Sequence, residues 1–272
     1  MLTTEPIIIN ISGDWVSVVL QFLTLILTGG SVWCAFRAYK HQKDRTKKEA
    51  ACNLAKEYAS SVIEKYADIN SVFAGAGIME MVRSSFNLRE LNNFDKEELE
   101  ALFKKNNVDR AAFEMKITYI DPKIILNSRM LRACSTEERE RTFACYASKD
   151  EEGNPKVVNG SYLQNDLAYE IASLLNELEW FAMTCRYGLA DEEILYQSLH
   201  KTFLSTVWML YYHISSNNVN NEDKLYTNVI WLFCKWRDRL NEITDSAEAR
   251  KQEYIKRAES VKPKVYEGTK LK

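Results

Sequence analysis

The sequence predicts an all-α protein in which a single N-terminal transmembrane helix runs into a cytoplasmic helical bundle. Three observations support this fold class. Residues 15–36 contain no formal charge, apolar residues recur with a helical period in the last third of the chain, and no segment alternates as a strand does. With 46% hydrophobic and 27% charged residues and only 4 prolines, the 272-residue chain has the composition of a folded protein.

The uncharged stretch WVSVVLQFLTLILTGGSVWCAF is long enough to cross a membrane. As a helix it would extend about 33 Å, against a hydrocarbon core of about 30 Å. Residues 1–14 have no Lys or Arg, whereas 37–48 have six against Asp44 alone. The positive-inside rule therefore predicts an external tail over 1–14, a span over 15–36 in the inner membrane, and a cytoplasmic remainder. A cleaved signal peptide would show the opposite order of charges.

The segments after the span are predicted from capping residues and from Gly and Pro. No Gly or Pro interrupts 37–69, which predicts one basic juxtamembrane helix continuing the span. A helical domain over 70–244 follows, and the charged tail over 245–272 is either a solvated helix or disordered. Within the domain we expect a second helical stretch over 71–86, a helix capped by Asp95 and Glu98, a break or helix start at Asp121-Pro122, a helix capped by Ser135 and Glu138, and a loop over 149–160.

Three helices in the last third are predicted to be antiparallel neighbours. Over 161–187 the apolar residues recur at intervals of three and four, which indicates one buried stripe. Gly188 is the expected C-cap of this helix, and Asp191 is the expected N-cap of the next, which extends to Ile214. After a polar link, a third helix extends from about Leu225 to Leu240. Short connections of this kind are typical of helical bundles.

A pattern of polar residues marks this same region. An Asn and a Glu lie on one helix, an Arg-x-Gly-x-x-Asp-Glu turn follows, and a Trp lies near the end: Asn176, Glu179, Arg186, Gly188, Asp191, Glu192 and Trp236. Over about 165–240 the chain resembles an uncharacterised bacterial family of domains of unknown function. Members of that family have one N-terminal span, a basic juxtamembrane helix and a helical cytoplasmic domain. The resemblance implies architecture more than activity.

The first three residues of this pattern have two interpretations. Asn176, Glu179 and Arg186 either line a polar pocket that receives a ligand or hydrogen-bond across to a neighbouring helix. The structural interpretation is favoured, because buried polar groups usually satisfy one another.

No motif in the sequence predicts catalysis. The three histidines, 41, 200 and 213, are not spaced as metal ligands, and the six cysteines form no Cys-x-x-Cys pair. There is no phosphate-binding loop and no nucleophile elbow. We therefore expect no enzyme activity, no cofactor and no metal site, and we expect most cysteines to be small buried side chains.

The predicted span has a face of small and polar residues. Its members are spaced four and three residues apart: Ser17, Gln21, Thr24, Thr28 and Ser31. Such residues are costly in hydrocarbon unless they meet other helices or water, so they predict self-association. In a lone helix the hydroxyls could bond to their own backbone, but Gln21 would remain unpaired. A pore lined by this face is a further possibility, with weak ion selectivity because the lining is uncharged.

These features predict an oligomeric membrane effector, a pore or ion channel gated by a signal sensed in the helical domain. Its general build is similar to membrane effectors of bacterial anti-phage systems of the retron, Hailong and cyclic-nucleotide types. The expected partners are further copies, membrane lipids, and either a nucleotide or oligonucleotide signal or a protein. The net charge of −2 predicts no general nucleic-acid binding. The alternative function is a membrane-tethered interaction module without a pore. An anionic signal would need a local basic site, for which the candidates are Arg129, Arg132, Lys235, Arg237 and Arg239.

Overall fold

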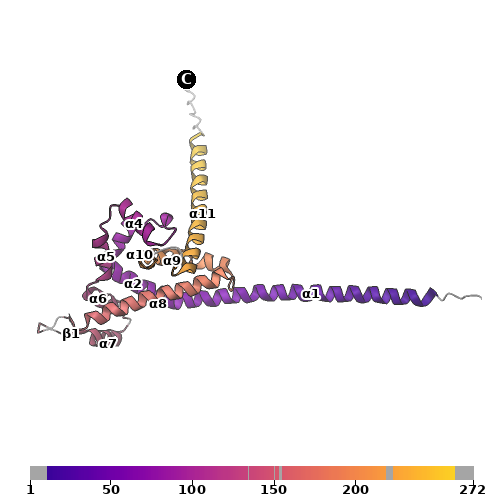
Figure 1. Ribbon diagram of the computed structural model, residues 1–272, viewed down its shortest axis with the longest axis horizontal. Coiled ribbons are helices and arrows are strands. Elements are labelled where there is room, and N and C mark those ends of the chain that lie inside the picture. The colour runs from indigo at the N-terminus through magenta and orange to yellow at the C-terminus, as the bar shows by residue number, and fades with distance from the viewer. Residues whose placement is uncertain (1–10, 134, 150, 153–154, 219–222, 261–272) are drawn as a thin grey trace, which may run out of the picture.

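A single long helix projecting from a cluster of shorter helices makes up the protein (Figure 1). The computed structural model describes residues 11–133, 135–149, 151–152, 155–218 and 223–260, and the side chains of all of these except 11–22, 24, 25, 155 and 258–260. The predicted all-α class is confirmed, since helices make up nearly the whole of the described chain.

The projecting helix continues without a break into the helical cluster. Helix α1 (Ile11–Glu57) passes into a π-helical turn, η1 (Tyr58–Val62), and then into α2 (Ile63–Gly75). The absence of Gly and Pro over 37–69 predicted this continuity. A separate helix was expected over 71–86, and its predicted first residue is wrong. Residues 71–75 still belong to α2, and Gly77, with a φ of 69°, separates α2 from α3 (Ile78–Ser85).

For part of the predicted span only the backbone is described. This holds for residues 15–22, 24 and 25, whose backbone is helical. Among the residues that were described, no helix is both long and apolar enough to cross a membrane. The described part of the stretch is solvent-exposed at its large apolar side chains, with Leu27 at 73%, Trp33 at 60% and Phe36 at 67%.

The middle of the chain consists of short helices that begin at side-chain caps. A 3-10 turn, η2 (Leu88–Glu90), precedes α4 (Lys96–Lys105), α5 (Arg110–Thr118), α6 (Pro122–Arg132) and α7 (Thr136–Tyr146). The predicted starts are confirmed: Asp95, Asp121 and Ser135 each accept a hydrogen bond from a backbone N–H of the first turn. Glu98 departs from a capping box, because its carboxylate accepts instead from the backbone N–H groups of residues 92–94.

A small antiparallel hairpin lies where a plain loop was predicted. Strand β1 (Ala147–Lys149) pairs with β2 (Pro155–Val157), with Ala147 opposite Val157. Each strand has three residues, which is too short for an alternating pattern to be visible in the sequence.

The last third forms four helices: α8 (Gly160–Arg186), α9 (Glu192–Met209), α10 (Tyr211–Asn217) and α11 (Thr227–Ser260). The predicted stripe of α8 is buried from Leu163 to Cys185. The single helix predicted from Asp191 to Ile214 is wrong, because it is interrupted at Leu210. Residues 245–260 continue α11 as a helix, the first of the two alternatives proposed, and the side chains of 245–257 are exposed. The rest of the predicted tail, 261–272, lies outside the described residues.

Helix α8 lies within the cluster, whereas α11 leaves it (Figure 1). Helix α8 lies along η1 and α2, whereas α11 packs on α8 and α9 and then points away from the α1 axis (Figure 1). The prediction that α11 is a neighbour of its two predecessors is confirmed, but α11 runs across α8 and not antiparallel to it. Helices α8, α9 and α11 meet at a buried aromatic cluster. The ring centroid of Trp236 lies 5.1 Å from that of Phe203 and 6.0 Å from that of Phe181.

Candidate functional site

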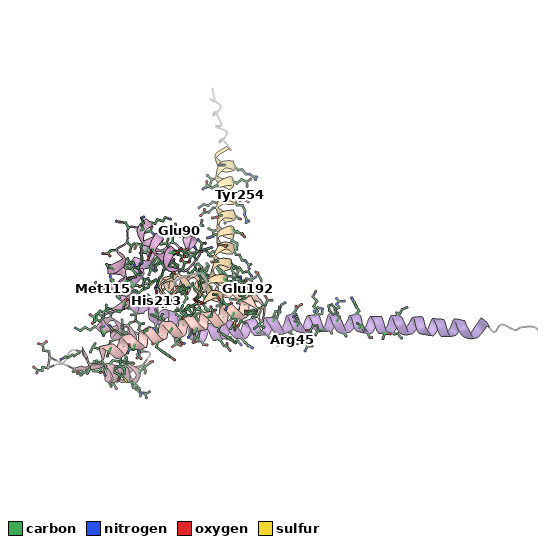
Figure 2. All side chains as sticks on the ribbon, in the orientation of Figure 1. Arg45, Glu90, Met115, Glu192, His213 and Tyr254 are labelled. Carbon is green, nitrogen blue, oxygen red and sulfur yellow. The ribbon has the colours of Figure 1, made fainter. Side chains whose placement is uncertain are left out.

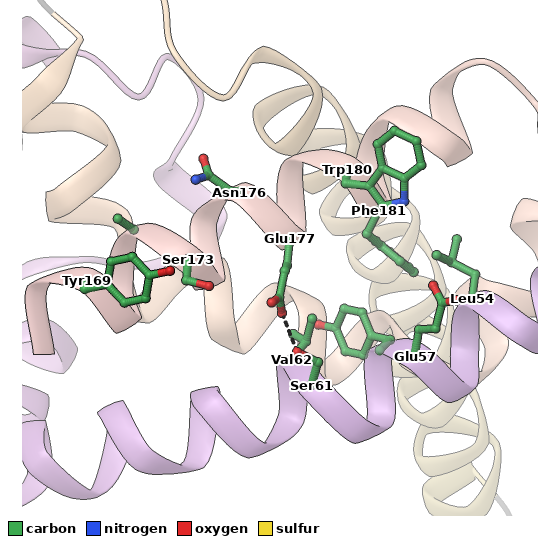
Figure 3. Close-up of a pocket in the computed structure, with 12 residues that line it drawn as sticks. Leu54, Glu57, Ser61, Val62, Tyr169, Ser173, Asn176, Glu177, Trp180 and Phe181 are labelled. Carbon is green, nitrogen blue, oxygen red and sulfur yellow. Dashed lines mark hydrogen bonds between the residues drawn. The ribbon is translucent and has the colours of Figure 1, made fainter. Parts of the chain in front are cut away.

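A groove lies between the end of the projecting helix and α8 (Figure 3). Its volume is about 460 Å³, within the range of small-molecule sites. The floor is apolar and buried, formed by Leu54, Tyr58 and Val62 on one side and Phe181 on the other. We call this cavity the α1–α8 groove.

Polar side chains cross one end of the groove. The carboxylate of Glu177 accepts a hydrogen bond from the Ser61 hydroxyl at 2.8 Å and forms an ion pair with Lys65. Lys65 Nζ also donates to Ser173 Oγ at 2.9 Å. Glu177 is therefore held by two residues of η1 and α2, which joins α8 to the projecting helix at this point.

The mouth of the groove is aromatic and acidic. Tyr169 is 75% exposed and Trp180 is 59% exposed, although both line the cavity. Asn176 and Glu57 are exposed at the same mouth. Asn176 is the one residue of the predicted polar pattern that lines this groove.

One wall of the groove is the π-helical turn. Tyr58, at the start of η1, is 2% exposed, and its ring centroid lies 4.8 Å from that of Phe181. Burial raises the pKa of the Tyr58 hydroxyl, so this group is neutral at physiological pH. Single π-helical turns within α-helices are uncommon and are frequent at functional sites.

A second cavity of about 340 Å³ lies on the other side of α8. It is mainly apolar and contains His213, whose ring stacks on Phe73 with centroids 5.8 Å apart. Figure 2 shows His213 inside the cluster, whereas Arg45 and Tyr254 lie on the projecting parts of α1 and α11. Burial lowers the pKa of His213 to about 4, so the imidazole is neutral at pH 7.

Two residues of the predicted polar pattern hold the start of α11. Glu179 accepts hydrogen bonds from Asn228 N at 3.2 Å, Asn228 Nδ2 at 2.6 Å and Val229 N at 3.0 Å. Arg186 donates to Asn228 Oδ1 at 3.0 Å and lies over the ring of Trp231. The contacts of Glu179 and Arg186 thus run between helices, as the structural interpretation expects.

The remaining pattern residues shape the turn between α8 and α9. Gly188 has a φ of 62°, and its N–H donates to Cys185 O at 3.1 Å, which confirms the C-cap. The side chain of Asp191 caps α9 as predicted. The carboxylate of Glu192 accepts from Trp236 Nε1 at 3.1 Å and from Lys235 Nζ at 2.5 Å. These contacts fix α9 against α11.

The predicted basic residues do not form one site. Arg129 and Arg132 lie on α6, and Lys235, Arg237 and Arg239 lie on α11. Each is paired with a carboxylate of the same chain: Arg129 with Asp166 and Glu170, Arg132 with Asp68, Lys235 with Glu192, Arg237 with Asp238, and Arg239 with Glu193. None of them lines the α1–α8 groove.

The predicted polar face of the span is described only in part. The side chains of Ser17, Gln21 and Thr24 lie outside the described residues. Thr28 and Ser31 are exposed, and Ser31 Oγ donates to Thr28 O at 2.8 Å. A hydroxyl bonded to its own helix backbone in this way does not need a second helix.

The cysteines differ from expectation. Cys34, Cys52 and Cys145 are exposed, and of the described cysteines only Cys185 is buried, which raises its pKa to about 12. The sequence pattern placed most cysteines on apolar helix faces. Cys34, Cys52 and Cys145 nevertheless lie on the solvent side of their helices. Within the described residues, no three His, Cys, Asp or Glu side chains are grouped as metal ligands.

Sequence reasoning missed most of the polar and aromatic residues that line the groove, namely Glu57, Tyr58, Ser61, Tyr169 and Trp180, and it missed the Lys65 that pairs with Glu177. One signal was available. Three aromatic residues of α8 and one at its C-cap recur at intervals of 7, 11 and 7, at positions 162, 169, 180 and 187, and all are exposed. Those intervals place them on a single line of the helix, opposite the buried stripe.

Comparison with known proteins identifies the family. The model of a family described as "Domain of unknown function (DUF4760)" matches residues 101–236, which is 136 of the chain's 272 residues. No curated protein and no solved structure matches the chain, so nothing supports the similarity to anti-phage effectors. The matched segment contains α8, α9 and every residue of the polar pattern. The chain belongs to the DUF4760 family.

Proposed function

We propose that this protein is a membrane-anchored sensor: an oligomeric, single-span effector of the bacterial inner membrane whose cytoplasmic helical domain receives a signal at the α1–α8 groove. One observation carries the proposal. The helix that contains the uncharged stretch runs unbroken into the domain, and its π-helical turn forms a wall of the groove. A ligand in the groove would therefore contact the same helix that enters the membrane.

The distance between these two regions suits mechanical coupling. From Phe36 to Tyr58 the chain rises about 33 Å, at about 1.5 Å per residue. A continuous helix over this length transmits rotation and translation, whereas a Gly-rich or Pro-rich linker would absorb them. The exposed apolar side chains near Leu27, Trp33 and Phe36 are of the kind that a bilayer covers.

A second candidate function is a tethered interaction module without a pore. The exposed aromatic line of α8 favours it, since Tyr162, Tyr169, Trp180 and Tyr187 are each between 59% and 75% exposed. Exposed aromatic residues in a row are typical of protein-binding surfaces. In this alternative the anchor only positions the domain, and its polar face has no role.

The mass of the full-length protein in a mild detergent separates the two functions. We expect a discrete oligomer that is lost in the double variant Gln21→Leu/Thr24→Leu and kept in Val19→Leu/Ile26→Leu, whose positions lie on the opposite side of the helical repeat. An oligomer that resists both changes, or a monomer, would leave the interaction module. Ion flux through vesicles that contain the wild-type oligomer then tests for a pore.

Membrane anchoring is tested separately by fractionation. We expect the chain to remain with membranes after a carbonate wash, and a variant with Leu23→Lys/Leu27→Lys to be released. Release of the wild-type chain by carbonate would refute the anchor, and with it both candidate functions.

A further inference from the structure

We infer that the α1–α8 groove binds a small organic cation with an aromatic or otherwise apolar body. The inference deepens the proposed function by naming the class of the signal, and its role as a signal rests on that function. Binding itself requires only α8 and the end of the long helix beside it, residues 54–62, and not the predicted span. Size, apolar floor, charge and aromatic mouth each support the assignment.

The groove has the dimensions and the floor of a small-molecule site. Its volume of about 460 Å³ accommodates a compact ligand rather than a folded partner. Leu54, Val62 and Phe181 are each 8% exposed or less, so the floor is preformed by the core. An apolar ligand body would bury this surface at about 25 cal/mol per Å².

The charge of the lining selects a cation. Glu57 and Glu177 are the only charged residues among those that line the groove in the described chain. The ion pair with Lys65 balances the charge of Glu177, which leaves the carboxylate of Glu57 as the excess charge at the mouth. Figure 3 shows Glu57 extending from the projecting helix toward α8. A positively charged group entering the groove is attracted by this carboxylate, and an anion is repelled.

The aromatic mouth supplies a second preference for a cation. Trp180 and Tyr169 line the groove and present most of their ring surface to solvent. The face of such a ring attracts an ammonium group. Tyr169 and Trp180 are 11 residues apart on α8, about 16 Å, so each ring offers a separate contact.

The same features exclude the nucleotide signal from this site. Phosphate groups require Lys, Arg or free backbone N–H groups. Among the described residues that line the groove there is no Lys or Arg, and the ammonium of the adjacent Lys65 is already bound by Glu177 and Ser173. The walls are helix interiors whose N–H groups are bonded within the helices. A nucleotide would meet two carboxylates there.

Equilibrium dialysis of the full-length protein in a nonionic detergent tests the assignment, with detergent alone as the blank. The probes are benzyltrimethylammonium chloride and benzyl alcohol, which share an aromatic body and differ in charge. We expect the cation to bind about fivefold more tightly, as a desolvated cation–π contact with a nearby carboxylate implies. Equal affinities, or no binding of the cation at millimolar concentration, would refute the inference.

Matched variants locate the site. Glu57→Gln and Trp180→Leu replace exposed residues, so we expect folded proteins by circular dichroism and a loss of affinity for the cation of about threefold or more in each. Glu64→Gln is the control, because it removes an exposed carboxylate of α2 that does not line the groove. If all three variants bind like wild type, the cation lies elsewhere and the inference fails. A monomeric protein that still binds the cation would refute the proposed assembly and leave this inference intact.

Discussion

Replacement of Glu179 should loosen the attachment of α11 to the rest of the domain. Its carboxylate accepts three hydrogen bonds, two of them from backbone N–H groups in the first turn of α11. Those N–H groups have no partner within the helix, and a negative charge at a helix N-terminus is itself favourable. Glu179→Ala removes the charge and leaves the donors to poorly accessible water. We expect a loss of about 2–4 kcal/mol in the free energy of unfolding.

The conservative variant grades the effect. Glu179→Gln keeps one acceptor oxygen but loses the charge, so we expect about half the cost, about 1–2 kcal/mol. For a chain of this size the Ala variant should lower Tm by about 5–15 °C. Near-ultraviolet circular dichroism, to which buried aromatic residues such as Trp236 contribute, follows the transition during urea unfolding. Glu64→Ala is the control, since Glu64 is exposed.

Hydrogen exchange distinguishes this local cause from a general loss of stability. In Glu179→Ala the exchange of the Asn228 and Val229 amides should accelerate more than the exchange of the α8 amides does. A general loss of stability would accelerate both groups equally. The reasoning is refuted if the Ala variant unfolds within 0.5 kcal/mol of wild type, at about the size of an ordinary surface change. Unchanged protection of the Val229 amide would refute it as well.

Three further changes have defined outcomes. Burial lowers the pKa of His213 from 6.5 to about 4, so the unfolded chain binds a proton that the folded chain excludes. The free energy of unfolding should therefore fall as the pH drops from 6.5 to 4, and titrations of His213→Phe should show a dependence flatter by about 2–3 kcal/mol over that window. The side chain of Asn218 is fully buried, donates a hydrogen bond to Phe94 O at 2.9 Å and accepts one from Leu225 N at 2.8 Å. Asn218→Leu should therefore lower the free energy of unfolding in urea by about 2–4 kcal/mol. Equal stability of wild type and variant would show that water replaces those bonds. Gly188→Ala should cost about 1 kcal/mol from its φ of 62° alone, because the nearest atom to a new Cβ is Lys47 Nζ at 3.5 Å, and a larger loss in calorimetry would indicate a clash instead.

The features that the sequence predicted correctly are local. Asp121, Ser135 and Asp191 bond to N–H groups two or three residues away, so each cap is determined within a few residues. The buried stripe of α8 is equally local, because it repeats within one helix. Such patterns need no knowledge of what the helix packs against.

The features that were missed depend on contacts between distant segments. The ion pair of Glu177 with Lys65 joins residues 112 positions apart, and neither residue looks unusual in its own helix. The π-helical turn at Tyr58 adds one residue to a single turn of the helix, and the spacing of the apolar residues around it is still typical of an α-helix. The direction of α11 follows from the contacts of Glu179 and Trp236, which a pattern within α11 cannot show.

The direction of α11 also limits how densely copies of this protein can be packed. A helix has a diameter of about 10 Å, so neighbouring α1 helices can approach closely. Residues 241–260 alone extend α11 by about 30 Å, to one side of the α1 axis (Figure 1). The part of each copy that contains α11 is therefore much wider than α1, and it extends to one side of the α1 axis. If copies associate through α1, as proposed, they would be turned relative to one another so that the α11 helices point in different directions. Such an assembly favours few copies arranged with rotational symmetry.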